Sequence, residues 1–260
     1  MAVNEPGANE FGAILRRYRS ARRMSQLDLA NACEISARHL SFLESGRSQP
    51  SREMVLHIGA GLLLPRSARN ALLQAAGFTP AFPASPLDSQ ALGPFRAILN
   101  EMMDRHAPNP ALLVDRHWNV QEANASARTL LSALSGGSDE LNIVRILTTG
   151  EHIGEVIANL PEVLEEMASR LQLEALEAGD DPAFADLLAA LERAGAKLPT
   201  PETRGRRPIV PLVINAAGGQ LSFLSAIAHF GTSEDVTIRD LRLELLFPAD
   251  DHTRYAMANV

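Results

Sequence analysis

The sequence has only one cysteine, Cys33, and only one lysine, Lys197. A single cysteine cannot form an internal disulfide or assemble a thiolate metal site by itself, so disulfide scaffolds and zinc fingers are excluded. No apolar run reaches the roughly 18 residues that a membrane helix needs, and the N-terminus lacks the basic and apolar segments of a secretory signal. We therefore expect a cytoplasmic protein that does not enter a membrane.

The charge is unevenly distributed along the 260 residues, whose number favours two domains. The net charge is −7, with 46% apolar and 21% charged residues, an ordinary globular composition. Residues 1–80 contain ten Arg and six acidic side chains, a net charge of +4, which leaves −11 for the remainder. The sequence thus predicts a small basic domain followed by a larger acidic one. Nearly every cation is a guanidinium, which can pair bidentately with phosphate or guanine.

A proline-rich stretch marks the boundary between the two domains. Prolines recur at every third position from Pro80 to Pro86, which fixes φ, removes backbone donors and favours a semi-extended linker. Gly77 is expected to end the preceding helix in a left-handed C′ conformation. We predict a first domain over residues 1–78, a linker over residues 79–90 and a second domain over residues 91–260.

The first domain is predicted to be all-α, with five short helices. Apolar residues recur at helical spacing from Phe11 to Tyr18 in the first of them. Serine hydroxyls accept hydrogen bonds from the free N–H groups of a first turn, and Pro65 suits the first turn of the fifth helix. The expected N-caps of the second, third and fourth helices are Ser25, Ser36 and Ser51.

The most informative motif lies within residues 25–51. A short turn at Glu34 and Ile35 separates two helices, as in a helix-turn-helix whose second helix enters a DNA major groove. Ala30 is small where the two helices must approach closely. The segment resembles the XRE, or phage-repressor type, helix-turn-helix. This resemblance implies a five-helix domain that binds double-stranded DNA.

Positions within the motif predict the role of each residue at DNA. Gln26 and Ser36 begin the two helices, where side chains and free N–H groups bind phosphates, and His39 and Arg47 are further phosphate candidates. Arg38 can pair with guanine O6 and N7. The predicted DNA-binding residues are Gln26, Ser36, Ala37, Arg38, His39, Ser41, Phe42 and Arg47.

Several of these positions have a second interpretation. Ala37 or Phe42 can contact a thymine methyl, but Phe42 equally suits packing on the fourth helix. His39 equally suits a solvated surface position. Glu44 is expected to bond locally near the end of its helix rather than read a base. Cys33 occupies an apolar helix position and is expected to be a buried, inert thiol.

After the linker, helices alternate with strands. Residues 111–114 and 118–120 flank a polar turn and predict a hairpin, and several helices are expected between residues 123 and 193. A loop rich in proline and glycine is expected over residues 199–208. Three later segments have period-two apolar patterns: residues 209–214, 221–230 and 241–247. They predict an α+β domain built on an antiparallel sheet, with helices packed over one face.

A wider resemblance rests on two runs and the linker between them. The runs are SARHLSFLE at Ser36–Glu44 and NPALLVDRHWNVQEAN at Asn109–Asn124, and Leu245–Asp251 also fits. Together they resemble the MmyB-like transcription regulators, which place a PAS-like ligand-binding domain after an XRE-type DNA-binding domain. The resemblance implies a sensor of a small molecule, such as a fatty acid or another elongated apolar ligand. It is weak over residues 150–205, so it identifies no pocket residues there.

Candidates for the ligand site come from residue type. Trp118, Met167 and Phe223 are large apolar groups that could line a cavity between sheet and helices, although each also suits an ordinary core position. Asn124 is expected to be a helix N-cap first and a ligand contact second. The predicted ligand-binding residues are therefore Trp118, Asn124, Met167 and Phe223. No cofactor is expected beyond a bound fatty acid or other apolar small molecule.

Catalytic and metal-binding motifs are absent from the sequence. It contains no G-x-S-x-G, P-loop, G-x-G-x-x-G or H-E-x-x-H pattern, and its histidines are scattered. The acidic pair Glu165–Glu166 is typical of a solvated helix face. We expect a regulator rather than an enzyme, and a homodimer, because one recognition helix reads too few base pairs for specificity. The alternative is an antitoxin-like or adaptor-like interaction protein whose second domain only dimerises.

Overall fold

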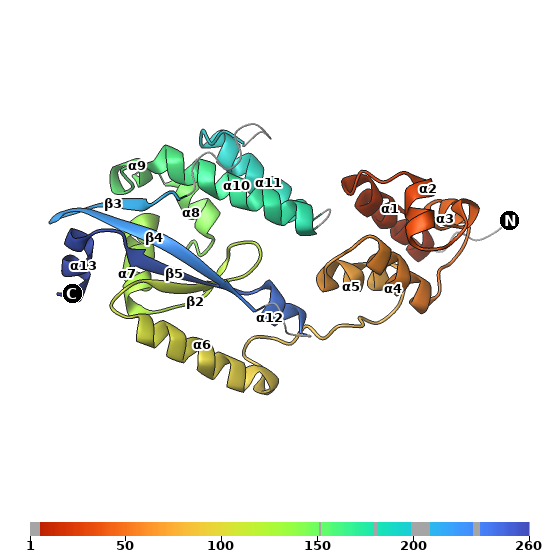
Figure 1. Cartoon of the computed structure of the whole chain (residues 1–260), viewed down its shortest axis with the longest axis horizontal. Coiled ribbons are helices and arrows are strands. Elements are labelled where there is room, and N and C mark those ends of the chain that lie inside the picture. Colours follow the sequence, from red (N-terminus) through yellow and green to blue (C-terminus); the bar gives the residue numbers. More distant parts are fainter. Residues whose placement is uncertain (1–5, 151, 179–180, 199–208, 231–234, 260) are drawn as a thin grey trace. The chain divides into compact units, whose positions relative to one another are not determined.

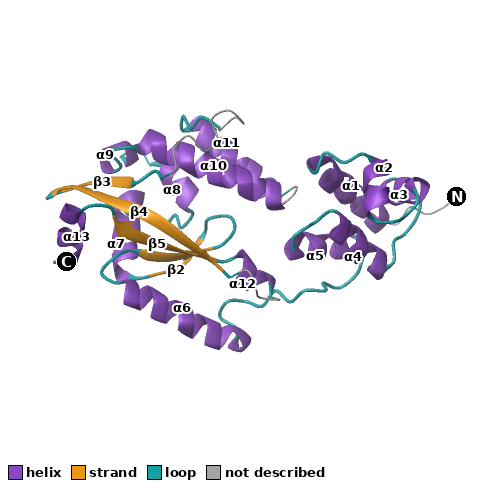
Figure 2. Ribbon diagram, viewed as in Figure 1, coloured by secondary structure: helices purple, strands orange, loops and turns teal. Residues whose placement is uncertain are grey.

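The computed structural model describes residues 6–150, 152–178, 181–198, 209–230 and 235–259. The chain forms two compact units: residues up to Ala84 make up most of the first, which is helical, and most of the residues from Ser85 onward belong to the second, which is built around a sheet (Figures 1 and 2). No helix in the described ranges is long and apolar enough to cross a membrane. The loop predicted over residues 199–208 lies outside the described residues.

The first unit contains the five predicted helices. The hydroxyls of Ser25, Ser36 and Ser51 accept hydrogen bonds from the N–H groups three residues later, which confirms all three N-caps. Pro65 differs from the prediction, because its extended ψ of 161° places it at the N-cap rather than inside the first turn. Gly77 has a φ of 81°, as predicted for the end of the fifth helix. The helices are α1 (Pro6–Ala21), α2 (Gln26–Ala32), α3 (Ala37–Glu44), α4 (Arg52–Gly61) and α5 (Arg66–Ala75).

One apolar core joins these helices. Phe11, Leu15, Leu40 and Leu43 are almost wholly buried in it. Helix α1 approaches α3 closely at Gly12, where a Cβ would lie 2.6 Å from the carbonyl oxygen of Glu44. Only glycine permits this contact, since real Cβ atoms essentially never come so near.

The start of the predicted linker is fixed to α5. The side-chain amide of Asn70 donates to the carbonyl of Phe82 at 2.8 Å, and its oxygen accepts from the N–H groups of Ala81 and Phe82 at 3.0 and 3.1 Å. Asn70 is 8% exposed. This part of the chain is therefore a packed extension of the first unit rather than a free spacer.

The second unit is an α+β fold, as predicted. Its described strands form an antiparallel sheet in the order β2-β1-β5-β4-β3, and most of the helices lie between β2 and β3 in sequence. The strands are β1 (Ala111–Val114), β2 (Val120–Ala123), β3 (Leu212–Ala216), β4 (Gly219–His229) and β5 (Arg242–Pro248). The longer helices are α6 (Gly93–His106), α7 (Ala125–Ser135), α10 (Leu160–Ala178) and α11 (Pro182–Arg193). The shorter ones are η1 (Gln90–Leu92), α8 (Ile143–Thr149), α9 (Ile153–Val156), α12 (Val236–Asp240) and α13 (Asp251–Ala258).

Helices cover both faces of this sheet, so the prediction of one covered face was wrong. Leu113 and Leu243, which pair across β1 and β5, pack on Leu99 and Met103 of α6. The neighbouring pair, Leu112 and Glu244, faces the opposite side, since successive side chains of a strand alternate. Helices α7, α8 and α10 lie over that second face (Figure 1). Strand β1 is buried along its whole length. The period-two pattern of the later strands does not show how many faces of the sheet are covered.

The hairpin of β1 and β2 forms where it was predicted, but its turn is longer. Trp118 has a φ of 65° and is fully buried, so it belongs to the turn and not to the second strand. The carboxylate of Asp115 accepts hydrogen bonds from the N–H groups of His117 and Asn119 at 2.8 and 3.0 Å. These bonds close the turn and delay the start of β2 until Val120.

Candidate functional site

Helices α2 and α3 form a rigid pair. The side chain of Asp28 accepts from the N–H of Ser25 at 2.8 Å, while the Ser25 hydroxyl accepts from the N–H of Asp28 at 3.1 Å, a complete capping box. The turn between the helices places Glu34 at a φ of 51°, and the N–H of Ile35 donates to the carbonyl of Ala30 at 2.9 Å. Ala30 is 1% exposed, as expected for the point of closest approach.

Helix α3 buries one side and leaves the other accessible. Leu40 and Leu43 are fully buried in the core. Ser36 and Arg38 are exposed at the start of the helix, and Arg47 is exposed in the loop that follows its end at Glu44. The other predicted DNA contacts on α3 are half-buried: Ala37, His39, Ser41 and Phe42. Ala37 packs partly against the core.

Two guanidinium groups lie over the ring of Phe42. The Cζ atom of Arg38 is 5.3 Å from the ring centroid and that of Arg47 is 6.0 Å from it. Both distances are within the range of a cation–π interaction. Phe42 therefore contacts two arginines with different predicted roles: Arg38 was expected to contact a guanine and Arg47 a phosphate.

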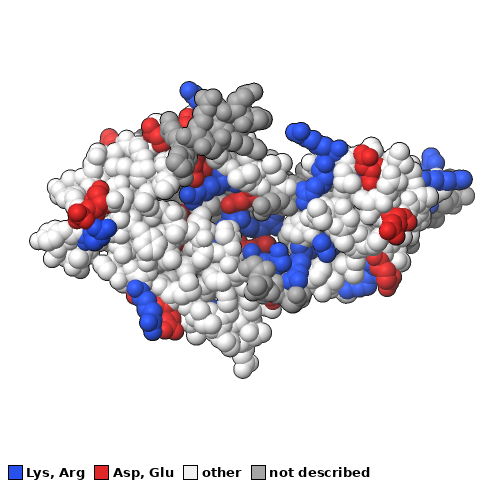
Figure 3. Space-filling model, in the orientation of Figure 1, with Lys and Arg blue, Asp and Glu red and all other residues white. Residues whose placement is uncertain are grey.

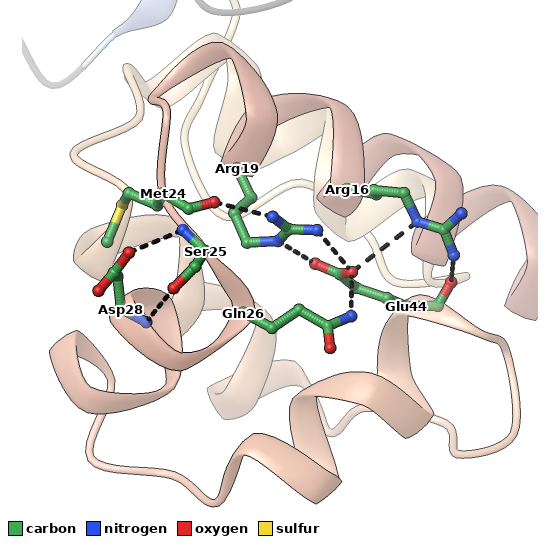
Figure 4. Close-up of polar contacts among 7 residues, drawn as sticks. All are labelled: Arg16, Arg19, Met24, Ser25, Gln26, Asp28 and Glu44. Atoms are coloured by element: carbon green, nitrogen blue, oxygen red, sulfur yellow. Dashed lines mark hydrogen bonds and ion pairs between the residues drawn. The ribbon is translucent and has the colours of Figure 1, made fainter.

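The carboxylate of Glu44 is the centre of a hydrogen-bonded network (Figure 4). Glu44 accepts from Nε of Arg19 at 2.6 Å, from Nη2 of Arg19 at 3.0 Å and from Nε2 of Gln26 at 2.7 Å. Arg19 also donates to the carbonyl of Met24 at 2.8 Å. The prediction of local bonding was wrong, because Glu44 joins α3 to α1 and α2 across 25 and 18 residues of sequence. No spacing pattern could have revealed these partners.

Opposing influences set the pKa of Glu44. Burial raises it, but hydrogen bonds from Arg19 and Gln26 and the charges of Arg19 and Arg16 outweigh the burial, so the pKa lies below its ordinary value of 4.5. The hydrogen bond to Glu44 raises the pKa of Arg19. The pair is therefore ionised at neutral pH and keeps the first turn of α2 fixed relative to α3.

Gln26 has one of its amide protons engaged by this network. Its Nε2 donates inward to Glu44, so the predicted phosphate contact would use the remaining amide proton or the free N–H groups of the first turn of α2.

Cys33 is 1% exposed, as predicted, and burial raises the pKa of its thiol. Within the described ranges, no group of three or more His, Cys, Asp and Glu side chains is arranged to hold a metal ion.

A cavity of about 110 Å³ lies between the sheet and helices α7, α8 and α10 of the second unit. Met167 and Phe223, two predicted ligand residues, line it from α10 and β4. The apolar part of the lining is Leu112, Ala127, Leu130, Leu131, Leu134, Ile143, Leu147, Val163, Met167, Val210, Leu212, Phe223 and Leu246. The cavity is thus formed mainly by aliphatic side chains, as in typical small-molecule sites.

The other two predicted ligand residues lie outside the cavity lining. Trp118 is fully buried in the β1–β2 turn, where Arg242 lies 6.0 Å from its ring centroid. Asn124 caps α7 and donates to the carbonyls of Met103 and Asn109 at 3.2 and 2.9 Å. Its side-chain oxygen also accepts from the N–H groups of Ala111 and Ala127. Both residues therefore have structural roles, and the N-cap interpretation of Asn124 is confirmed.

Four polar residues missed by the sequence predictions form one wall of the cavity: Glu166, Arg170, Ser225 and Glu244. Nε of Arg170 donates to Glu166 at 3.0 Å, and Nη1 lies 3.6 Å from the carboxylate of Glu244. The hydroxyl of Ser225 donates to Glu244 at 2.6 Å. Glu166 thus lines the cavity, while its side chain remains 34% exposed, so the predicted solvated face is only partly correct. Its spacing of four from Arg170 indicated the ion pair, but only the fold shows that the pair meets a charge on β5.

Figure 3 shows one face of the second unit. On the face shown in Figure 3, most of the surface of the unit that holds the sheet is formed by uncharged residues. The acidic surplus predicted from the sequence is therefore not displayed as a continuous acidic surface on that face.

Comparisons with known proteins agree with both halves of this description. Residues 10–72 match a helix-turn-helix domain family, and residues 95–259 match the family described as the MmyB-like transcription regulator ligand binding domain. The chain is also 28% identical over 177 residues to HTH-type transcriptional regulators of Mycobacterium bovis and of two strains of Mycobacterium tuberculosis. That match spans 65% of this chain and 62% of the length of each relative. With well over half of its length matched, the chain belongs to the MmyB-like transcription regulator ligand-binding domain family, and its N-terminal unit is a helix-turn-helix domain.

Proposed function

We propose that this protein is a sequence-specific, DNA-binding transcriptional regulator of the cytoplasm whose second unit binds a small molecule with a largely apolar body. The observation that carries the proposal is at α3, where Arg38 of the helix and Arg47 beyond its end both lie over the ring of Phe42. The helix itself is fixed by its cap and by Glu44. Relatives named as HTH-type transcriptional regulators support the proposal.

Each residue of this surface has a proposed role. Arg38 reads a guanine, while Ser36, His39, Arg47 and the start of α2 at Gln26 contact phosphates. Ala37, Ser41 and Phe42 complete the surface that faces the bases. An exposed guanidinium at the start of a recognition helix is the commonest reader of guanine, which supports the assignment of Arg38.

Retardation of DNA by the full-length chain tests this function. We expect specific retardation of the protein's own promoter fragment in the presence of competitor DNA, with affinity that falls as salt rises. Arg38→Ala should weaken the specific complex, and Arg105→Ala, which removes an exposed cation of α6, should not. Equal binding to every sequence, or none at all, would contradict the proposal and favour an antitoxin-like or adaptor-like interaction protein.

A homodimer is part of the proposal, because two recognition helices are needed to read enough base pairs for specificity. The half-sites would lie about 34 Å apart, one helical turn of DNA, with the dimer contacts in the second unit. Sedimentation of the full chain at micromolar concentration should give a dimer. A monomer both with and without DNA would contradict this part.

The cavity of the second unit is the proposed ligand site. Its aliphatic lining supports a ligand with an apolar body. Of the expected fatty-acid-like ligand, the lining supports this apolar part. Extraction of the purified protein followed by mass spectrometry should find such a molecule when affinity is high. Val163→Phe, which fills the cavity from α10, should lose the extracted molecule while the protein stays folded. Retention of the molecule by this variant would place it elsewhere.

A further inference from the structure

Helix α6, on the side of the sheet opposite α10, covers that face only in part (Figure 1). Ala228 of β4 pairs with Leu243 of β5, and both pack in the core under α6. Side chains alternate along a strand, so Ala226 and Leu224 of β4 lie on the same face as Ala228. Ala226 is exposed, Leu224 is half-buried, and neither belongs to the core under α6. The β4 side of this face is therefore accessible.

The accessible region extends to the two neighbouring strands. Phe247 of β5 pairs with Leu224 and is 44% exposed. Val213 of β3 pairs with Ser222, which precedes Leu224 by two residues and so lies on the same face. Val213 is half-buried. Three strands thus contribute apolar side chains to one region.

The side of α6 that carries Ile98 borders this region. Arg96 lies 3.8 Å from Glu122 of β2, and β2 is at the opposite end of the strand order from β4. Two residues along a helix differ by about 200° in direction, so Ile98 projects away from β2 and toward β4. His106, eight residues further along α6, contacts the ring of Phe247 with 4.7 Å between the centroids.

The region is formed by uncharged side chains, and we call it the β4 patch. At its border, Glu101 and Arg105 of α6 form an ion pair at 2.7 Å, so their charges offset each other. Ile98 is 57% exposed, the same fraction as the most exposed of the apolar side chains in loops of this unit near β2. The β4 patch consists of Ile98, Met102, Val213, Leu224, Ala226 and Phe247.

Phe247 connects the β4 patch to a hollow of about 320 Å³. Pro108 and Met257 are among the apolar residues that line the hollow. The Oδ1 atom of Asn109 is buried there without a hydrogen-bond partner among the described residues. Arg254 also lines the hollow, and its charge is offset by an ion pair with Asp251. The hollow therefore extends the neutral surface and offers one acceptor to a donor from outside.

We propose that the β4 patch is the contact surface between two copies of this chain, related by a two-fold axis. In such a contact each copy presents the same surface to the other. The residues after position 80 carry the net charge of −11, so two copies repel each other where acidic surfaces meet and can approach where side chains are uncharged. A basic partner protein would instead favour the acidic surfaces of this unit. The inference rests on the proposed homodimer and names its surface.

Charged substitutions within the β4 patch test the proposal. Sedimentation of the full-length wild type at micromolar concentration should give a dimer. Ala226→Glu should raise its dissociation constant about a hundredfold, because each copy then presents a carboxylate to the other, and Ile98→Glu should act in the same direction. Leu141→Glu is the matched control, since Leu141 is 57% exposed like Ile98 but lies beside β2. A monomeric wild type, or dimers of both patch variants, would overturn the proposal.

Opposite charges at one position provide a second test. Ala226→Lys alone should be monomeric, but an equimolar mixture with Ala226→Glu should form mixed dimers at least about tenfold tighter than either variant alone. Absence of mixed dimers would show that the two copies do not meet at this position, against the proposal. Ala226 is exposed, so both variants should fold, and circular dichroism checks this.

DNA retardation distinguishes this inference from the proposed function. A monomeric Ala226→Glu that has lost affinity for the specific fragment supports both. If this variant is monomeric and keeps full affinity, the surface stands and the need for a dimer on DNA does not. If the wild type binds specific DNA while both patch variants remain dimeric, the regulator function stands and the β4 patch is not the dimer surface.

Discussion

Arg19 of α1 donates two hydrogen bonds to the buried carboxylate of Glu44 at the end of α3, at 2.6 and 3.0 Å. The side chain of Glu44 is fully buried and that of Arg19 is 13% exposed. Since this carboxylate also holds Gln26 at the start of α2, one ion pair fixes the positions of the first three helices. The DNA-reading surface proposed for α3 depends on it.

Arg19→Met should destabilise the first unit by about 3 kcal/mol, because it leaves a buried carboxylate without its strongest partner. Arg16→Met is the matched control. Arg16 lies 3.8 Å from the same carboxylate, but its side chain is 59% exposed, so its loss should cost less than about 1 kcal/mol. Urea unfolding of the two variants measures the difference. Equal losses of unfolding free energy in the two variants would show that burial of the Arg19–Glu44 pair does not determine its contribution to stability.

Stability of the first unit should fall in acid through Glu44. The pKa of Glu44 is lowered in the folded state, so its contribution is fully present above its ordinary value of 4.5 and is lost as pH falls below that value through the folded pKa. Urea unfolding between neutral pH and pH of about 3 tests this. Glu44→Gln should show a shallower loss over that window than the wild type. Parallel curves for the two proteins would contradict the assignment.

Arg38→Ala should cost about 1 to 3 kcal/mol of discrimination at one base pair, whereas Arg47→Ala should weaken all sequences alike. The measurement is retardation of specific and scrambled sites by the full chain. A phosphate contact gives the same loss on both sites. If Arg38→Ala behaves in that way, the proposed register of α3 on DNA is wrong.

Phe42→Leu should weaken the specific complex by about 0.5 to 1 kcal/mol, because leucine keeps an apolar side chain but removes the ring that holds Arg38 and Arg47. A double-mutant cycle with Arg38→Ala separates this from direct contact. Coupling between the two substitutions is expected if Phe42 acts through Arg38. Strict additivity would instead indicate that Phe42 contacts DNA by itself.

Asn124→Ala should destabilise the second unit by about 3 kcal/mol, since it removes the cap of α7 and leaves buried backbone groups of Met103, Asn109 and Ala111 without this partner. Asn124→Asp keeps the acceptor oxygen and should cost less. Thermal unfolding compares the two. A stable Asn124→Ala variant that has lost the molecule extracted from the purified protein would return Asn124 to the ligand site.

Local features of this protein were determined by the sequence alone. Ser25, Ser36 and Ser51 cap their helices, and Gly77 ends α5, because these effects need only the residue and its near neighbours. The same holds for the short turn between α2 and α3 and for the apolar strands of the sheet. The resemblances carried by residues 36–44 and 109–124 predicted the family of the whole chain.

Contacts between distant residues were decided only by the tertiary structure. Glu44 was expected to bond locally and instead binds Arg19, because helix packing brings α1 and α3 together at Gly12. Glu166 was expected to face solvent, yet it also lines the cavity and pairs with Arg170, which lies 3.6 Å from Glu244 of β5. A pattern along the chain records which residues are apolar or charged. Which charges meet across a core depends on how the elements pack, and the helices on both faces of the sheet determined that here.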